Sequence, residues 1–226
     1  MSQEIKIINL GSVNCYLLKT GTKFLLVDTG PANKRFELTR ELENAGCRPG
    51  DLNLILATHG DSDHVGNCAY VHREYGAMIA LHRAEVDAVK LGDPVLNKNL
   101  PHGFRGMILR MIVRLFRLKP ADCFAPDVLI DDGCNLASYG LDAQILHIPG
   151  HSHGSIGVLT SQGDLLCGDL LKNMRHPASG FGIFDRLEFE ATIDKLIRLN
   201  IHTVYPGHGK PFAWEQFMKN YRRKAS

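Results

Sequence analysis

The stretch that decides the fold is Thr58-His59-Gly60-Asp61-Ser62-Asp63-His64, which follows the apolar run Leu52-Asn53-Leu54-Ile55-Leu56-Ala57. The run predicts a buried strand, and the stretch then places two imidazoles and two carboxylates close together. Imidazole nitrogens and carboxylate oxygens are the ligands that zinc, iron and manganese take in proteins, and a loop at a strand end can aim several side chains at one point. The alternative interpretation is an ordinary polar turn before a helix.

Three later segments have the same order of features: an apolar run, a glycine, and then a potential metal ligand. They are Ile145-Leu146-His147-Ile148-Pro149-Gly150-His151, Asp164-Leu165-Leu166-Cys167-Gly168-Asp169 and Thr203-Val204-Tyr205-Pro206-Gly207-His208. Because the same arrangement recurs along one chain, a metal site is favoured over a chance polar turn.

In this order the segments resemble the metallo-β-lactamase superfamily, whose pattern is T-H-x-H-x-D-H, then G-H-[ST], then G-D, then a final G-H. The resemblance runs from Asn14-Cys15-Tyr16-Leu17-Leu18 and Leu26-Val27-Asp28-Thr29-Gly30 to His208, so it covers nearly the whole chain. It implies an α/β fold, the αββα sandwich of two mixed β-sheets with helices on the outer faces and metals at the edge between the sheets. We expect a single domain over residues 1–226 with a helical insertion at about 92–126.

The hydrophobic pattern agrees with that fold, because strands followed by helices occur twice. In the first half, strands are predicted at 5–10, 15–20, 23–27, 52–57 and 77–81, and helices at 34–45, 65–75 and 83–91. In the second half, strands are predicted at 128–130, 134–139, 144–148, 155–160, 165–167 and 203–205, and helices at 188–199 and from Trp214.

The resemblance also implies a ligand set for two divalent metal ions. His59, the residue at position 61 and His151 would hold the first ion, and Asp63, His64 and His208 the second. Asp169 would bridge both ions, and Asp28 would orient the metal loop. Two ions about 3.5–4 Å apart can share a water, lower its pKa and present hydroxide to a carbonyl. Asp63 is then the catalytic candidate that holds or accepts the water's proton.

This chemistry predicts a metal-dependent hydrolase acting on an ester-like bond of a small molecule, namely a thioester, lactone or lactam. The alternatives are a phosphodiesterase, a non-hydrolytic iron-dependent oxidoreductase, or an inactive metal-binding protein of the same fold. Lys172 follows Asp169 by three residues, where some lactamases place a lysine that grips a substrate carboxylate. The resemblance therefore gives weak support for an anionic substrate.

The chain departs from the family pattern at Asp61, which replaces the second histidine of the motif. A carboxylate is a harder donor and brings negative charge, which favours iron or manganese more than a histidine would. Zinc is still the metal expected first. Asp61, Asp63 and Asp169 would repel one another, and the site could hold one ion instead of two. Replacing Asp61 with histidine is expected to restore the histidine pair and shift metal preference toward zinc.

The insertion contains an amphipathic segment over residues 104–119, in which Arg110, Arg114 and Arg117 recur at helical spacing. They leave an apolar face, which is predicted to comprise Met107, Ile108, Met111, Ile112 and Leu115. The segment is too short and too charged to cross a bilayer, so stable membrane insertion is not expected. It could pack on its own domain, form a wall or lid that supplies an apolar acyl pocket, form a homodimer surface, or touch anionic lipid.

Composition limits the partners. The chain has 226 residues, of which 44% are hydrophobic, and its formal net charge is +2. Such a chain can build a substantial core, and its charge gives no argument for a nucleic-acid partner, so a small-molecule substrate is expected. The first residues lack the basic and apolar pattern of a signal peptide, and the six cysteines form no C-x-x-C pair. We therefore expect a cytoplasmic protein with reduced thiols.

Overall fold

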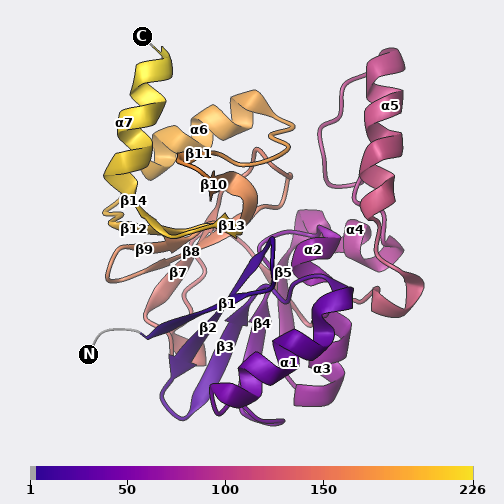
Figure 1. The fold of residues 1–226 in the computed structure, drawn as a ribbon, viewed down its shortest axis with the longest axis vertical. Helices are drawn as coiled ribbons and strands as arrows, with labels where there is room; N and C mark the ends of the chain where they lie inside the picture. Colours follow the sequence, from indigo (N-terminus) through magenta and orange to yellow (C-terminus); the bar gives the residue numbers. More distant parts are fainter. Residues whose placement is uncertain (1–3, 226) are drawn as a thin grey trace.

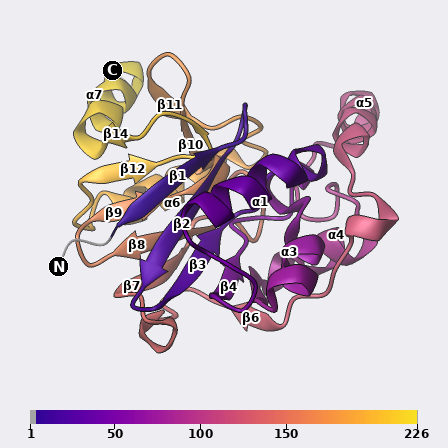
Figure 2. The same ribbon diagram turned by 60° about the horizontal axis from the view of Figure 1, so that its bottom comes forward.

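Two β-sheets packed face to face organise the computed structural model, which describes the backbone of residues 4–225 and the side chains of residues 4–221 (Figures 1 and 2). The first sheet has six strands in sequence order: β1 (Ile5–Asn9), β2 (Asn14–Thr20), β3 (Lys23–Val27), β4 (Leu52–Leu56), β5 (Met78–His82) and β6 (Val128–Ile130). The first three strands are antiparallel, and β3 to β6 run parallel. The sheet is therefore mixed, as predicted.

The second sheet has the strand order β14-β12-β9-β8-β7. Its members are β7 (Ala143–His147), β8 (Ile156–Thr160), β9 (Asp164–Leu166), β12 (Thr203–Tyr205) and β14 (Phe212–Ala213). A small third sheet, ordered β11-β10-β13, consists of β10 (Leu171–Asn173), β11 (Pro177–Ser179) and β13 (His208–Gly209). Two pairs of strands are parallel: β9 pairs with β12, and β10 pairs with β13.

Helices cover the outer faces of both large sheets, which confirms the predicted αββα sandwich (Figure 1). On the first sheet these are α1 (Arg35–Asn44) and α3 (Cys68–Tyr75), and on the second they are α6 (Arg186–Leu196) and α7 (Trp214–Ala225). The middle of β2, from Cys15 to Leu18, is apolar on both faces because both faces are buried. Tyr16 and Leu18 point into the core between the sheets, while Cys15 and Leu17 pack with the α1 and α3 layer.

Two predicted elements were wrong in detail. Residues 134–139 do not form a strand beyond a single bridge from Asn135, because the Asn135 side chain accepts a hydrogen bond from the Ala137 amide and a 3-10 turn follows. The helix predicted at 65–75 is divided into α2 (Ser62–Val65) and α3. The division lies at Asn67, whose side-chain amide donates to the carbonyls of Thr29 and Pro31 and ties this turn to the end of β3. Local side-chain hydrogen bonds overrode the pattern in both places.

The segment after α4 (Val86–Leu91) contains α5 (Gly103–Val113), which stands apart from the other helices at the upper right of Figure 1. Most of its large apolar side chains are well exposed, and only Gly106 and Val113 are buried within it. Across residues 4–225, no helix combines the length and the apolar character needed to span a bilayer.

The metal ligands predicted from the sequence all lie at or beyond strand ends. The Thr58–His64 stretch follows β4, His151 lies between β7 and β8, Asp169 follows β9, and His208 begins β13. Polar side chains at strand ends can converge without disturbing the apolar layers.

Candidate metal centre

On one side of the site, His64 and His208 are each fixed through Nδ1. His64 Nδ1 donates to Asp28 Oδ2 over 2.8 Å, and His208 Nδ1 donates to the Ser12 carbonyl over 2.5 Å. A carbonyl can only accept, so the proton must lie on Nδ1 of His208. Both rings therefore turn Nε2 toward the interior of the site, which is the orientation that a metal-ligating histidine needs.

His59 and His151 are oriented in the same way on the other side. His151 Nδ1 donates to the Phe181 carbonyl over 2.8 Å, and His59 Nδ1 lies 3.0 Å from Thr58 Oγ1. The Thr58 hydroxyl donates its own proton to Asp28 Oδ2 over 2.8 Å, so its oxygen is left to accept from His59. All four rings thus direct Nε2 into one centre.

Asp28 holds both sides of this arrangement together. Its Oδ1 accepts from the Thr58 amide over 2.8 Å, and its Oδ2 accepts from the Thr58 hydroxyl and from His64. Among the described residues other than glycine, Asp28 alone has a positive φ, at 59°. Such a backbone conformation costs free energy and is kept where the surroundings require it. The geometry agrees with the orienting role that the sequence resemblance implied.

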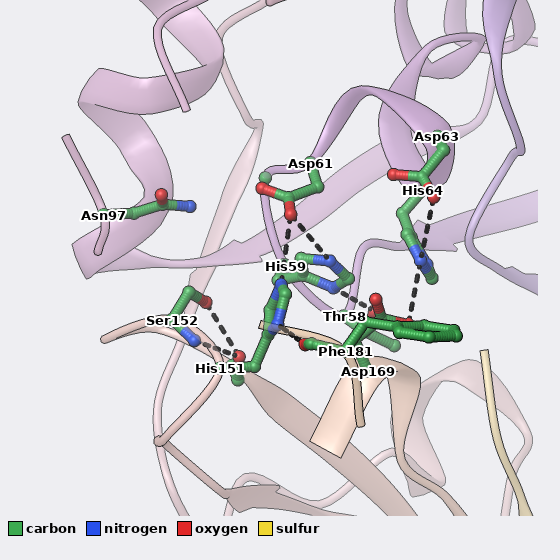
Figure 3. Close-up of polar contacts among 12 residues, drawn as sticks. Thr58, His59, Asp61, Asp63, His64, Asn97, His151, Ser152, Asp169 and Phe181 are labelled. Atoms are coloured by element: carbon green, nitrogen blue, oxygen red, sulfur yellow. Dashed lines mark hydrogen bonds and ion pairs between the residues drawn. The ribbon is translucent and has the colours of Figure 1, made fainter. Parts of the chain in front are cut away.

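Three carboxylates face the four Nε2 atoms, and Figure 3 shows Asp61 facing His59 and His151 while His64 faces Asp169. Asp169 Oδ1 lies 3.1 Å from His64 Nε2 and 3.3 Å from the Nε2 of His208. Asp61 Oδ2 lies 3.0 Å from His151 Nε2 and 3.7 Å from the Nε2 of His59.

Asp63 completes the cluster from the solvent side. Its Oδ2 is 3.5 Å from His208 Nε2 and 3.9 Å from His64 Nε2, and its side chain is 42% exposed. It is thus the carboxylate of the centre that a substrate or water can reach most easily.

The potential ligand atoms fall into three groups in which all atoms lie within 4.8 Å of one another. The groups are His59 with Asp61 and His151, His59 with His64 and Asp169, and Asp63 with His64 and His208. The first and third groups have the same members as the two sets that the resemblance implied, and we call them the first and the second position. Asp169 belongs to the group between them, as a bridging ligand would.

The electrostatics of the centre fit a bound cation. Among the described side chains, His59 Nε2, His64 Nε2 and Asp169 Oδ1 are buried without a hydrogen-bond partner. Nitrogen and oxygen lone pairs that face each other at such distances require positive charge between them. Burial lowers the pKa of His208, but Asp169 and Asp63 outweigh it and raise that pKa to about 10. A proton is therefore the competitor of a metal ion here, and the residues present fit divalent ions.

Sequence reasoning missed Glu85, a fully buried carboxylate that connects the two ligand loops of the first position. It accepts hydrogen bonds from the Gly60 amide, the Gly154 amide and the Ser152 hydroxyl, at 2.7–2.8 Å. The Asn97 side chain donates to the same carboxylate. Glu85 stands in a segment that matches no motif, so no signal in the sequence could have found it.

A cavity of about 470 Å³ lies over the centre. Its floor includes Asp61, Asp63, His151, Asp169 and His208, and its apolar lining includes Leu109, Ile112, Val113, Phe116, Phe181 and Phe184. The wall therefore comes partly from α5 and the turn after it. The predicted apolar face of this helix was wrong in part, because Met107, Met111 and Leu115 lie with Arg110 and Arg114 along a different hollow on the outer side.

The fold and the cluster together define a class of protein: an αββα sandwich with histidine and aspartate ligands at its strand ends. Comparison with known families assigns the chain within that class, because the family model described as the Metallo-beta-lactamase superfamily matches residues 8–208. The chain belongs to this superfamily. The predicted fold and family are thereby confirmed.

Two relatives and one solved structure illustrate the similarity. The chain is 29% identical to the hydroxyacylglutathione hydrolase GloC of Haemophilus influenzae, over 92% of this chain and 91% of that protein. It is 26% identical to the acyl-coenzyme A thioesterase MBLAC2 of Bos taurus, over 94% of this chain and 79% of that protein. The crystal structure of TTHA1623 in a di-iron-bound form superposes with a TM-score of 0.71 at 23% identity, over 96% of this chain and 97% of that one.

Proposed function

We propose that this protein is a metal-dependent hydrolase that cleaves the thioester or a related ester bond of a small molecule with an apolar acyl group. The observation that carries the proposal is the position of the ligand cluster at the floor of an apolar-walled cavity of about 470 Å³. A buried metal site with structural function alone would be closed on all sides, whereas this cluster opens to a space that a substrate can enter.

The proposed ligands are His59, Asp61 and His151 at the first position, and Asp63, His64 and His208 at the second, with Asp169 between them. Zinc suits this set, and the harder oxygen donors also admit iron or manganese. TTHA1623, the similar protein whose structure is of a di-iron-bound form, supports keeping iron among the candidates here.

Divalent ions held there would supply positive charge that polarises a substrate carbonyl and lowers the pKa of water at the site. The chain itself contributes the remaining parts of the mechanism. Asp63 Oδ2 faces the cavity near His208 and can hold or accept a proton from attacking water. Asp28 and the carbonyls of Ser12 and Phe181 keep His64, His208 and His151 in fixed tautomers while charge changes at the centre.

The apolar wall supports an acyl substrate. Leu109, Ile112, Val113 and Phe116 come from α5 and the following turn, and Phe181 and Phe184 from the segment before α6. Alkyl chains bind such surfaces through burial of apolar area. The names of the two relatives, a hydroxyacylglutathione hydrolase and an acyl-coenzyme A thioesterase, favour an acyl group on a thiol carrier over a lactam.

The test is hydrolysis of acyl thioesters of increasing chain length by the metal-loaded protein, with lactone, lactam and phosphodiester substrates beside them. Ile112→Ala and Phe116→Ala are expected to raise KM about fivefold for long acyl chains and little for acetyl, since each removes apolar wall area. Met107→Ala and Met111→Ala are the matched controls on the outer side of the same helix. Equal effects of inner and outer substitutions, or a preference for phosphodiesters, would contradict the proposal.

A further inference from the structure

Lys98 is a buried cation beside the first position that no motif of the sequence indicated. Its side chain is 2% exposed, and Nζ lies 2.5 Å from Asp61 Oδ1. A second contact reaches the side-chain oxygen of Asn97 at 3.4 Å. A buried ammonium is costly unless a carboxylate neutralises it, so Lys98 and Asp61 depend on each other.

The two oxygens of Asp61 have different partners. Oδ1 accepts from Lys98, whereas Oδ2 lies near Nε2 of His59 and His151, which is the side toward the first position. One oxygen is thus committed to the ammonium and the other is left for the centre.

The position of Lys98 is fixed by its neighbour in the chain. The Asn97 side chain donates to Glu85, and the Asn97 carbonyl accepts from the His153 amide over 2.8 Å. Glu85 in turn holds Gly60 and Gly154, which flank the loops of Asp61 and His151. These contacts fix the position of the Lys98 ammonium relative to the ligand loops.

We propose that Asp61 and Lys98 act as one charge-compensated unit that replaces the neutral imidazole of the superfamily motif. The inference rests on the proposed metal centre. A carboxylate of charge −1 and an ammonium of charge +1 sum to zero, so the pair leaves the first position with the net charge that a histidine would give. Because Lys98 compensates the charge of Asp61, the repulsion expected among Asp61, Asp63 and Asp169 is reduced.

This unit differs from a substrate-binding lysine. Lys98 borders the cavity, but only 2% of its side chain is exposed and its ammonium already lies 2.5 Å from Asp61 Oδ1, so it compensates Asp61 before any substrate anion. It also changes the expectation for Asp61→His. That substitution alone would leave the Lys98 ammonium unpaired beside a metal position, where it would repel the ion.

The test is a double-mutant cycle of wild type, Asp61→His, Lys98→Met and the double variant Asp61→His/Lys98→Met. Metal content per chain and the Kd for Zn²⁺ and Mn²⁺ are measured by competition with a chromophoric chelator. We expect Asp61→His to weaken the first position about 10- to 100-fold, and the double variant to recover most of that loss. The second position should keep its affinity in every variant, which serves as the internal control.

Melting temperature provides a readout that does not depend on turnover. Lys98→Met should lower the melting temperature of the metal-free protein and enlarge the rise on adding metal, because the ion then becomes the counter-charge of Asp61. Lys98→Arg, which keeps the charge, should behave nearly as wild type, and Lys119→Met is the exposed lysine control from the same segment. If Asp61→His folds poorly, the comparison of Lys98→Met with these two controls still decides the test.

Two negative results are distinguishable. If the double variant binds metal no better than Asp61→His, and Lys98→Met leaves the metal-induced rise unchanged, Lys98 is a structural ion pair and the inference is wrong. If wild type binds no ion at the first position under any condition, the proposed metal centre itself is wrong.

Discussion

The two proposed metal positions lie side by side but are supported in different ways. The second is anchored directly by the Asp28 carboxylate behind His64, with both side chains almost completely buried, whereas Asp28 reaches the first only through Thr58 and His59. The first is anchored through Glu85 and balanced by Lys98, and both of these lie in segments without a ligand motif. The second position therefore follows the superfamily pattern residue by residue, whereas the first relies on a compensation that lies outside that pattern.

The largest effect is expected from His64→Ala, which removes a ligand that belongs to two of the three groups. Turnover should fall by about 1,000-fold or more, because the loss of a metal ion removes several kcal/mol of transition-state stabilisation. Circular dichroism should show a folded protein, since the apolar layers are buried independently of the centre. His176→Ala, an exposed histidine, is the matched control. Wholesale unfolding of the variant or of chelator-treated protein would mean that the site is structural.

Gly207→Ala tests the second position through its backbone. A Cβ at this residue would lie 2.6 Å from Asp169 Oδ1 and 2.6 Å from His64 Cε1, so one of these ligands must move. We expect metal affinity to fall about 10- to 100-fold at the second position, which depends on both His64 and Asp169, and less at the first, which shares only Asp169 with it. Equal loss at both positions would show that they are not independently supported.

Glu85→Gln is the complementary test, because it should weaken metal binding at the first position and spare the second. The glutamine amide would present N–H groups to backbone amides that now donate to a carboxylate, and each buried donor without an acceptor costs about 1–3 kcal/mol. We expect a lower melting temperature and about tenfold weaker binding at the first position. The measurement is metal affinity at each position by chelator competition. A selective loss at the second position would contradict the assignment of Glu85 to the first.

Sequence reasoning anticipated which side chains cluster where each candidate ligand directly follows a strand. His59 to His64 follow a strand whose apolar run is clear, and the three later glycine turns mark the remaining ligands. It was insufficient where a partner comes from a distant, patternless segment: Lys98 lies 37 residues from Asp61, and Glu85 lies 67 residues from Ser152. It also misplaced the apolar face of α5, because spacing alone cannot tell which side of an exposed helix faces the cavity.

Hydrolysis at the metal centre is tested most directly by titrating metal-free protein with Zn²⁺, Mn²⁺ or Fe²⁺ while following both bound metal and hydrolysis of a medium-chain acyl thioester. We predict that hydrolysis rises in step with metal occupancy of the first and second positions and disappears again on chelation. Thioester hydrolysis by the metal-free protein, or full metal occupancy without hydrolysis of any ester-like substrate, would contradict the proposed function.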